Sequence, residues 1–265
     1  MQASFDYTGA NVLIFGGTSG INLGIAEAFA KAGATVGVCS RSEDKVNAAV
    51  ETLKAYGGKA AGYSLDVRNV DDVKSAAQSF HDEFGKIDVL VSGAAGNFPA
   101  PALGMSPNAF NSVVSIDLLG TFHVLQSCHP YLKQPGASVI NISAPQAYVP
   151  MMFQSHVCAA KAGVDMLTRT LALEWGPMGI RVNSIVPGPI ANTEGMDRLA
   201  PSEESKNLVR KSVPLGRFGE KSEIADTAMF LSSNAAQYVS GVILAVDGGW
   251  GLSGAGSLAN SMMHG

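Results

Sequence analysis

The sequence predicts an α/β protein whose parallel sheet carries helices on both faces. Apolar segments short enough for buried strands alternate with longer segments that have apolar residues at helical spacing. The first strand runs into a glycine-rich turn that opens a helix, as in a β-α-β unit. Because such crossovers are right-handed, successive units build one doubly wound sheet. We therefore expect a single domain over residues 1–265.

The expected elements follow in chain order. The strands are placed at 11–15, 35–39, 61–65, 89–92, 138–143, 181–186 and 242–246. A charged helix over 42–56 carries Val46, Val50 and Leu53 on its apolar side and ends at a glycine pair. The last residues, 253–265, show no periodicity and are expected to form a flexible tail.

Composition excludes several classes of protein. The net charge is −4, and there is no basic block of the kind that binds nucleic acid. The apolar runs are too short for a membrane span. Cys39, Cys128 and Cys158 are too widely spaced for a disulfide framework or a metal site, so we expect buried thiols. With neither a signal peptide nor a peroxisomal address, the chain is expected to be cytoplasmic.

The turn after the first strand has the composition of a dinucleotide pyrophosphate site. Glycines there let backbone N–H groups approach the anion, and the positive helix end favours its charge. Two of the three glycine positions are filled, but the third holds Asn22, whose β-carbon could shift the pyrophosphate. A plain turn is the alternative. The residues assigned to the cofactor here are Gly16, Thr18, Ser19, Gly20, Ile21 and Asn22.

The end of the second strand bears on which dinucleotide binds. An acidic residue there would bind the ribose 2′-hydroxyl of NAD, whereas Ser40 and Arg41 suit a 2′-phosphate. We therefore expect NADPH/NADP+. Asp66 and Val67 close the third strand, where the carboxylate could accept from the adenine amino group. Capping of the next helix by Asp66 is an equally open interpretation.

The fourth strand continues into small residues followed by Asn97 and Phe98. Ala94, Ala95 and Gly96 at the carboxyl end of a parallel strand let a ligand lie against the backbone. Asn97 and Phe98 would then project toward the active-site mouth. The alternative is a tight loop with Phe98 in the core.

From about residue 8 to 252 the sequence resembles the short-chain dehydrogenase/reductase family. The resemblance is carried by the glycine loop, Asp66-Val67, Ala94-Ala95-Gly96, Lys161 on a long helix, Arg181-Val182-Asn183 and Pro187-Gly188-Pro189. It implies a seven-stranded Rossmann fold and adds Lys161, Pro187, Gly188 and Ile190 to the cofactor contacts. It also implies a homotetramer assembled through two long helices, here about 107–131 and 154–175.

The sequence departs from this family at the residues that usually transfer the proton. The family places a tyrosine four residues before the lysine and a serine thirteen residues before that tyrosine. Here the two positions hold Val157 and Ala144, neither of which carries a transferable proton. A register shift could recruit Ser143, and Tyr148 could enter the pocket from a loop.

One branch of the family, the 2,4-dienoyl-CoA reductases, lacks this tyrosine, and its peroxisomal-type members are especially similar. The matching residues include His156 five before Lys161, Glu174-Trp175-Gly176-Pro177, and Asp117, where the wider family generally has asparagine. The resemblance implies NADPH-dependent hydride transfer to a dienoyl thioester. Asp117 and Lys161 would be the catalytic pair and would hold the water that supplies a proton to carbon.

An acyl-CoA thioester is therefore the expected substrate partner. The residues assigned to it are Asn97, Phe98, Ser143, Tyr148 and His156. The segment 189–213 is expected to be a lid whose apolar residues cover an acyl chain and whose cations Lys206, Arg210 and Lys211 meet CoA phosphates. A solvated surface helix is the alternative. Another thioester or keto reductase using Tyr148, and a non-catalytic NADP(H)-binding module, stay open as functions.

Overall fold

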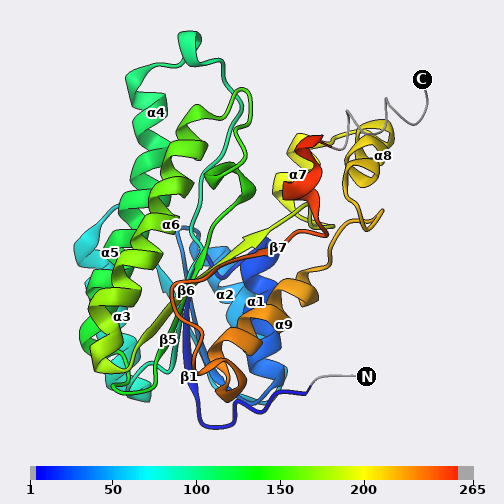
Figure 1. Cartoon of the computed structure of the whole chain (residues 1–265). Helices are drawn as coiled ribbons and strands as arrows, with labels where there is room; N and C mark the ends of the chain where they lie inside the picture. Colours follow the sequence, from blue (N-terminus) through cyan, green and yellow to red (C-terminus); the bar gives the residue numbers. More distant parts are fainter. Residues whose placement is uncertain (1–3, 256–265) are drawn as a thin grey trace, which may run out of the picture.

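The computed structural model describes residues 4–255, in which a seven-stranded parallel sheet lies between two layers of helices (Figure 1). The strand order is β3-β2-β1-β4-β5-β6-β7. From β1 the chain first adds strands on one side of the sheet and then, from β4 on, adds them on the other side. The strands are β1 (Asn11–Phe15), β2 (Thr35–Ser40), β3 (Ala60–Ser64), β4 (Val89–Ser92), β5 (Ser138–Ile142), β6 (Arg181–Pro187) and β7 (Ile243–Val246). The predicted fold class is confirmed, and the reversal point marks where a ligand crevice forms in such sheets.

The helices divide between the two faces of the sheet (Figure 1). On one face lie α1 (Gly20–Lys31), α2 (Glu43–Lys54) and α9 (Lys221–Ser232), and on the other α3 (Val70–Phe84), α4 (Pro107–Val114), α5 (Gly120–Cys128) and α6 (Ser155–Trp175). The helices α7 (Glu194–Leu199) and α8 (Glu203–Ser212) stand to one side of the carboxyl edge. Short 3₁₀ turns are η1 (Ala102–Gly104), η3 (His129–Tyr131), η4 (Pro145–Ala147), η5 (Gly176–Met178), η6 (Asn234–Ala236) and η7 (Trp250–Ala255).

The central strand β1 is buried on both faces because helices cover both. Val12 and Ile14 pack into the core with α1 and α9, whereas Leu13 and Phe15 pack into the core with α3 and α5. This alternation fixes the register of the strand and with it the position of the loop that follows. Among residues 4–255, no helix is both long and apolar enough to cross a membrane.

The long helix predicted over about 107–131 is present, but its winding changes in the middle. After α4 the chain makes a π-helical turn, η2 (Ser115–Leu119), before continuing as α5 and η3. The Thr121 hydroxyl donates to the Asp117 carbonyl at 2.7 Å, and Gly120 lies so close to Val67 that a β-carbon would come within 2.6 Å of it. This turn has one residue more than an α-helical turn. It contains Asp117, which is only 1% exposed.

Further expectations about element ends and about one cysteine need correction. Asp66 does not cap the next helix, because the N-cap of α3 is Asn69, whose side chain accepts from the Asp71 N–H. The third strand ends at Ser64, so Asp66 lies beyond it. Of the predicted tail, residues 253–255 belong to η7, and residues 256–265 lie outside the described part of the chain. Cys39 and Cys128 are buried as expected, but Cys158 is only partly so.

Candidate active site

The carboxyl edge of the sheet between β1 and β4 is hollowed into a cavity of about 270 Å³. Most of the residues predicted to bind the cofactor line it: Gly16, Thr18, Ser19, Asn22, Ser40, Arg41, Asp66, Val67, Ala94 and Ala95. Lys45, Ile116 and Glu194 line it as well, although none of the three was predicted to do so. The structure therefore brings together six segments of the chain at this cavity.

The amino end of α1 is arranged to receive an anion. Its N-cap residue, Ser19, is extended and makes no side-chain hydrogen bond to the first turn, so the N–H groups there are not capped. Gly16 has φ +79°, and a β-carbon on it would come within 2.9 Å of the Ala94 nitrogen. Gly20 has φ +55° and faces open space, while Ile21 is half-buried against the core beside α1.

Asn22, at the position where a third glycine was expected, braces the cavity. Its Nδ2 donates to the Gly93 carbonyl at 2.8 Å, so the side chain points toward the loop after β4. A β-carbon on Gly93 would come within 2.4 Å of that amide. The Asn22 side chain therefore fits because residue 93 is a glycine and leaves room for it.

The ribose end of the cavity is more basic than the sequence pattern alone indicated. Arg41 is exposed and Ser40 half-buried, and Lys45 from the first turn of α2 joins them in lining the cavity. Lys45 could have been noticed because it lies four residues after Arg41. Asp66 accepts from Arg68 Nε at 3.0 Å, and this guanidinium lowers the pKa of the Asp66 carboxyl.

Asp117 and Lys161 meet in the protein interior, as the resemblance implied. Asp117 Oδ2 lies 3.3 Å from Lys161 Nζ, and the two side chains are 1% and 6% exposed. Asp117 Oδ1 accepts from the Gly96 N–H at 2.7 Å, and Lys161 Nζ donates to the Ile142 carbonyl at 3.1 Å. Oδ2 itself has no hydrogen-bond partner in the described chain, so this buried oxygen is available as an acceptor.

The predicted replacements for the missing tyrosine and serine lie in different environments. Ser143 is buried, and its hydroxyl makes no well-formed hydrogen bond within the described residues. Tyr148 is 49% exposed, yet partial burial, and then Asp247 and Asp165, raise the pKa of its phenol. Val157 packs with Val113 and Ala160 in a small apolar cluster and leaves no polar group at that place.

The loop after β4 is held by a chain of side-chain amides. Gln146 Nε2 donates to Gln154 Oε1 at 2.7 Å, and Gln154 Nε2 donates to Asn97 Oδ1 at 3.3 Å. Asn97 is exposed, so its own Nδ2 is the donor that remains for a ligand. Gln154 is 2% exposed, and no sequence motif singled it out.

The rings of His156 and Phe98 pack against each other. Their ring centroids are 4.5 Å apart, and a second ring, Phe110, lies 6.4 Å from the histidine. His156 is fully buried, and neither ring nitrogen has a hydrogen-bond partner among the described residues. The histidine therefore packs here as an aromatic ring.

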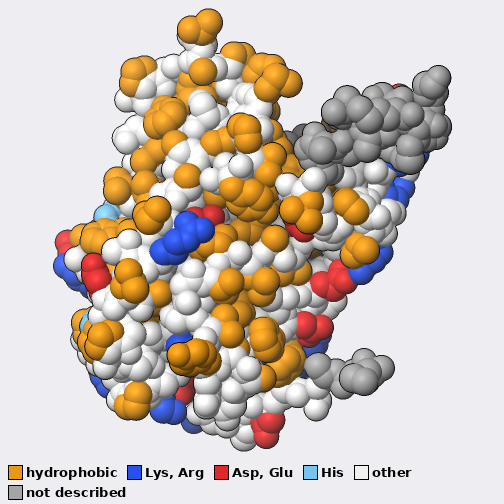
Figure 2. All heavy atoms as spheres, viewed as in Figure 1, with side chains coloured by type: hydrophobic (Ala, Val, Ile, Leu, Met, Phe, Trp, Pro, Cys, Tyr) orange, Lys and Arg blue, Asp and Glu red, His pale blue; other side chains and the backbone are white. Residues whose placement is uncertain are grey.

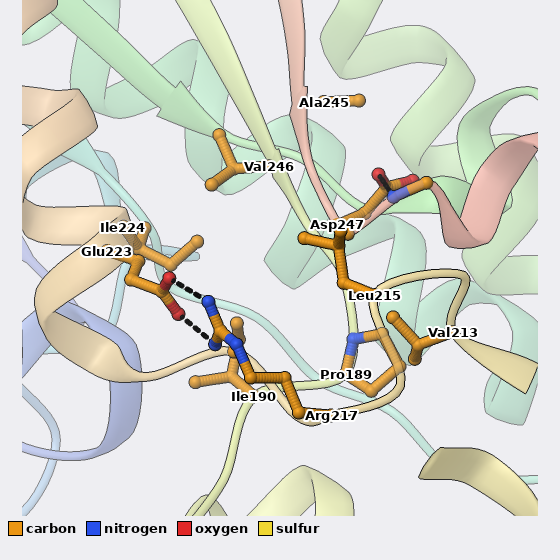
Figure 3. A pocket seen from close by; sticks show the side chains of 13 residues that line it. Pro189, Ile190, Val213, Leu215, Arg217, Glu223, Ile224, Ala245, Val246 and Asp247 are labelled. Atoms are coloured by element: carbon orange, nitrogen blue, oxygen red, sulfur yellow. Dashed lines mark hydrogen bonds and ion pairs between the residues drawn. The ribbon is translucent and has the colours of Figure 1, made fainter. Parts of the chain in front are cut away.

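A second cavity, of about 460 Å³, opens beyond the ends of β6 and β7 (Figure 3). Pro189, Ile190, Val213, Leu215 and Asp247 line it. Figure 3 shows two hydrogen bonds from Arg217 to the Glu223 carboxylate at its edge, and these bonds lower the pKa of Glu223 to about 2.

The remaining predicted cofactor residues, Pro187 and Gly188, lead from the end of β6 toward this second cavity. Gly188 contacts Asp247, since a β-carbon on it would come within 2.5 Å of the Asp247 Cα.

Comparison with known proteins agrees with this geometry. A family model described as enoyl-(acyl carrier protein) reductase matches residues 16–251. The chain is 44% identical to a peroxisomal 2,4-dienoyl-CoA reductase, (3E)-enoyl-CoA-producing, of Arabidopsis thaliana, over 92% of this chain and 85% of the relative. It is 45% identical to the mouse protein of that name, over 89% and 82%. A probable 2,4-dienoyl-CoA reductase of Bacillus subtilis, (2E)-enoyl-CoA-producing, is 38% identical over 90% and 95%.

Among solved structures, a short chain dehydrogenase from Bacillus anthracis superposes with a TM-score of 0.84 at 40% identity, covering 91% of this chain and 96% of that one. The chain belongs to the short-chain dehydrogenase/reductase family. Members of this family are oxidoreductases, and the family implies a nicotinamide dinucleotide as cofactor.

The uncapped amino end of α1 and the glycine cradle at Gly16 and Gly20 fit the pyrophosphate of such a cofactor. The fit is reached without the third glycine of the motif. In this short-chain dehydrogenase/reductase, the position of the third glycine holds Asn22. Its side chain makes a hydrogen bond to Gly93 where a glycine would leave the backbone flexible.

Replacing Asn22 with glycine, which would restore the glycine pattern, should weaken cofactor binding rather than improve it. The variant loses the hydrogen bond to Gly93, worth about 1 kcal/mol, and gains backbone freedom at the anion site. We expect the NADPH dissociation constant to rise about fivefold in a fluorescence titration. Asn47→Gly, the same change at an exposed position of α2, is the control and should leave the constant unchanged. Equal or tighter binding by Asn22→Gly would contradict the bracing role.

Proposed function

We propose that this protein is an NADPH-dependent reductase of 2,4-dienoyl-CoA thioesters. The observation that carries the proposal is the buried Asp117–Lys161 pair in a site where the usual tyrosine position holds Val157. Relatives that share 38–45% of their residues over nine-tenths of the chain carry the name of this activity. Reduction of a conjugated thioester also explains why the tyrosine is dispensable.

The chemistry needs a proton donor to carbon rather than to an alkoxide. When bound, NADPH supplies a hydride to the far end of the dienoyl chain. The resulting negative charge spreads to the thioester oxygen, so no alcohol has to be protonated. In the proposal, Asp117 Oδ2 and Lys161 hold a water that gives its proton to the dienolate. The carboxylate and the ammonium lie 3.3 Å apart, so both can contact the same water.

Two fixed contacts orient this pair. The Gly96 N–H holds Asp117 Oδ1, so Oδ2 is the oxygen left to accept from the water. The Ile142 carbonyl holds one Lys161 proton, and the ammonium keeps its other protons for ligands. The Asn97 amide and the Ser143 hydroxyl are the proposed donors to the thioester oxygen.

Asp117→Asn should abolish most turnover, and it should also lower the stability of the fold because Lys161 loses its buried partner. The amide keeps an acceptor for Gly96 but cannot stabilise the Lys161 ammonium, so we expect kcat with NADPH and 2,4-hexadienoyl-CoA to fall about 100-fold or more. Crotonyl-CoA and acetoacetyl-CoA are run in parallel, and product NMR identifies the position of the double bond. Asp82→Asn on the exposed face of α3 is the matched control.

The same assay separates the alternatives. Reduction of acetoacetyl-CoA alone would overturn the proposal in favour of a ketoreductase that uses Tyr148, although burial and two nearby carboxylates oppose the phenolate that such an enzyme needs. Tight NADPH binding without turnover of any of the three thioesters would favour a binding module.

We further propose that the cofactor is NADPH rather than NADH. Ser40, Arg41 and Lys45 line the ribose end of the cavity, and the two cations would pair with a 2′-phosphate. Arg41→Ala should raise KM for NADPH about tenfold or more without raising KM for NADH. Lys54→Ala at the far end of α2 is the control. An equal effect on both cofactors would contradict a 2′-phosphate contact.

A homotetramer is proposed from the apolar side chains exposed along α4, η2, α5 and α6. Phe110, Leu119, Phe122, Met166 and Leu173 are 38–81% exposed, and Figure 2 shows hydrophobic side chains gathered on the face that carries α4 and α6. Exposed apolar residues in such number are typical of subunit interfaces. Light scattering should give four times the 27.4 kDa chain mass, and Met166→Glu with Leu173→Glu should shift it toward smaller species. A wild-type monomer would contradict the proposal.

A cytoplasmic location stays a prediction from the sequence. The word peroxisomal in the names of the Arabidopsis and mouse relatives describes those proteins.

A further inference from the structure

The buried side chain of Gln154 has no role in the mechanism described above. Gln154 is the N-cap residue of α6, yet its side chain makes no hydrogen bond to the first turn of that helix. The residue is only 2% exposed, and its amide takes part in two hydrogen bonds with other side-chain amides. Burying a long polar side chain costs conformational freedom and hydration. We therefore asked what these two hydrogen bonds hold in place.

The two hydrogen bonds give the chain of amides a direction. Gln154 Oε1 accepts from Gln146 Nε2 at 2.7 Å, and Gln154 Nε2 donates to Asn97 Oδ1 at 3.3 Å. A side-chain amide has an accepting end and a donating end, so fixing one end fixes the other. Gln146 therefore determines which end of Gln154 faces Asn97. Because the oxygen of the Asn97 amide is occupied by Gln154, its Nδ2 group is left on the other side.

The backbone next to Gln154 is also fixed. Phe153 has φ +65°, in the left-handed region that residues with side chains rarely adopt. Its carbonyl accepts from the Ala100 N–H at 2.8 Å, and the Gln154 carbonyl accepts from the Cys158 N–H at 2.9 Å. Strained backbone of this kind persists only where the surrounding contacts determine it. The start of α6 is therefore joined to the loop after β4 through the backbone as well as through side chains.

The loop after β4 is held on both sides of Asn97. On one side the Gly96 N–H donates to Asp117 Oδ1 at 2.7 Å. On the other side the Phe98 ring packs on His156, with the ring centroids 4.5 Å apart. Asn97 itself is exposed, so its Nδ2 group can reach a ligand. The contacts around it leave the direction of its amide to be set by Gln154.

We infer that Gln154 is a positioning residue that holds the Asn97 amide with its N–H group, rather than its oxygen, toward the substrate. The inference rests on the proposed function, in which the Asn97 amide donates to the thioester oxygen. Negative charge develops on that oxygen during hydride transfer, and a donor stabilises it most when it is already oriented. An amide turned the other way would present its own oxygen and repel this charge. Gln154 acts through Asn97 and does not touch the substrate.

The test is a double-mutant cycle with NADPH and 2,4-hexadienoyl-CoA. Gln154→Met keeps the length of the side chain and removes both hydrogen bonds, so kcat should fall about tenfold while KM for the thioester changes by less than about threefold. Asn97→Ala should lower kcat about 100-fold. Because Gln154 acts only through Asn97, adding Gln154→Met to Asn97→Ala should cause no further loss. Gln237→Met, which removes a 3.2 Å hydrogen bond to Asn234 Oδ1 at an exposed position, is the matched control.

A structural role for Gln154 would give a different result. If Gln154 only stabilised the start of α6, the losses in Gln154→Met and Asn97→Ala would multiply in the double variant. Multiplied losses, or an unchanged kcat in Gln154→Met, would overturn the inference. Gln146→Met is a second variant at a less buried position. It leaves Gln154 in place without fixing its direction, so kcat should fall about threefold or more, again with no further loss in the Asn97→Ala background.

A readout without turnover keeps the two proposals distinguishable. Exchange of side-chain amide protons with water is followed by NMR in protein labelled with ¹⁵N at asparagine and glutamine, and each signal is assigned by its loss in Asn97→Ala or Gln154→Met. The Gln154 Nε2 protons should exchange about tenfold or more slowly than the Asn97 Nδ2 protons, because only the former are hydrogen-bonded within the chain. The opposite order, or equal rates, would overturn the inference. If the wild type does not reduce the dienoyl thioester, the proposed function fails while this measurement still decides the direction of the amides.

Discussion

The buried ion pair of Asp117 and Lys161 determines how the segments beyond the carboxyl ends of β4 and β5 are held together. A carboxylate and an ammonium taken out of water stabilise the fold only when their remaining hydrogen-bonding groups are satisfied, and losing one partner of such a pair costs about 3–5 kcal/mol. Three segments meet this requirement: the loop after β4 through Gly96, the end of β5 through Ile142, and the turn η2 that carries Asp117. The ion pair thus ties together the segments that would surround a substrate.

At the carboxyl edge of the sheet that lines the cofactor cavity, glycines leave room for residues of neighbouring segments. Asn22 fits because Gly93 has no side chain. Gly16 can approach Ala94 because Gly16 has no side chain either. The hydrogen bond from Asn22 to Gly93 joins the first turn of α1 to the loop after β4, and Gly96 in that loop holds Asp117. The anion site and Asp117, which is proposed to hold the proton-donating water, are therefore connected by only a few contacts. A change at either end is expected to be felt at the other.

Local patterns were enough to predict the strands and the glycine loop, because each depends on residues that are close in the sequence. The π-helical turn could not be predicted in this way. It depends on Gly120 packing against Val67 and on Thr121 bonding back to the Asp117 carbonyl, and the first contact joins distant segments. His156 was assigned to the substrate from the family resemblance, and local patterns gave no sign that its ring packs on Phe98, another residue assigned to the substrate.

The lid proposed for the segment after β6 would be able to change shape without disturbing the core. None of the residues of α8 is buried, and the helix is stabilised locally by a capping box between Ser202 and Ser205 and by the pairing of Lys206 with Glu203. Leu208 is 65% exposed, so the apolar face that the lid hypothesis needs is present but uncovered. A helix that carries its own caps can move as a unit at little cost, because few tertiary contacts must break. Covering Leu208 with an acyl chain would supply apolar burial that the protein alone does not provide, which makes closure dependent on substrate.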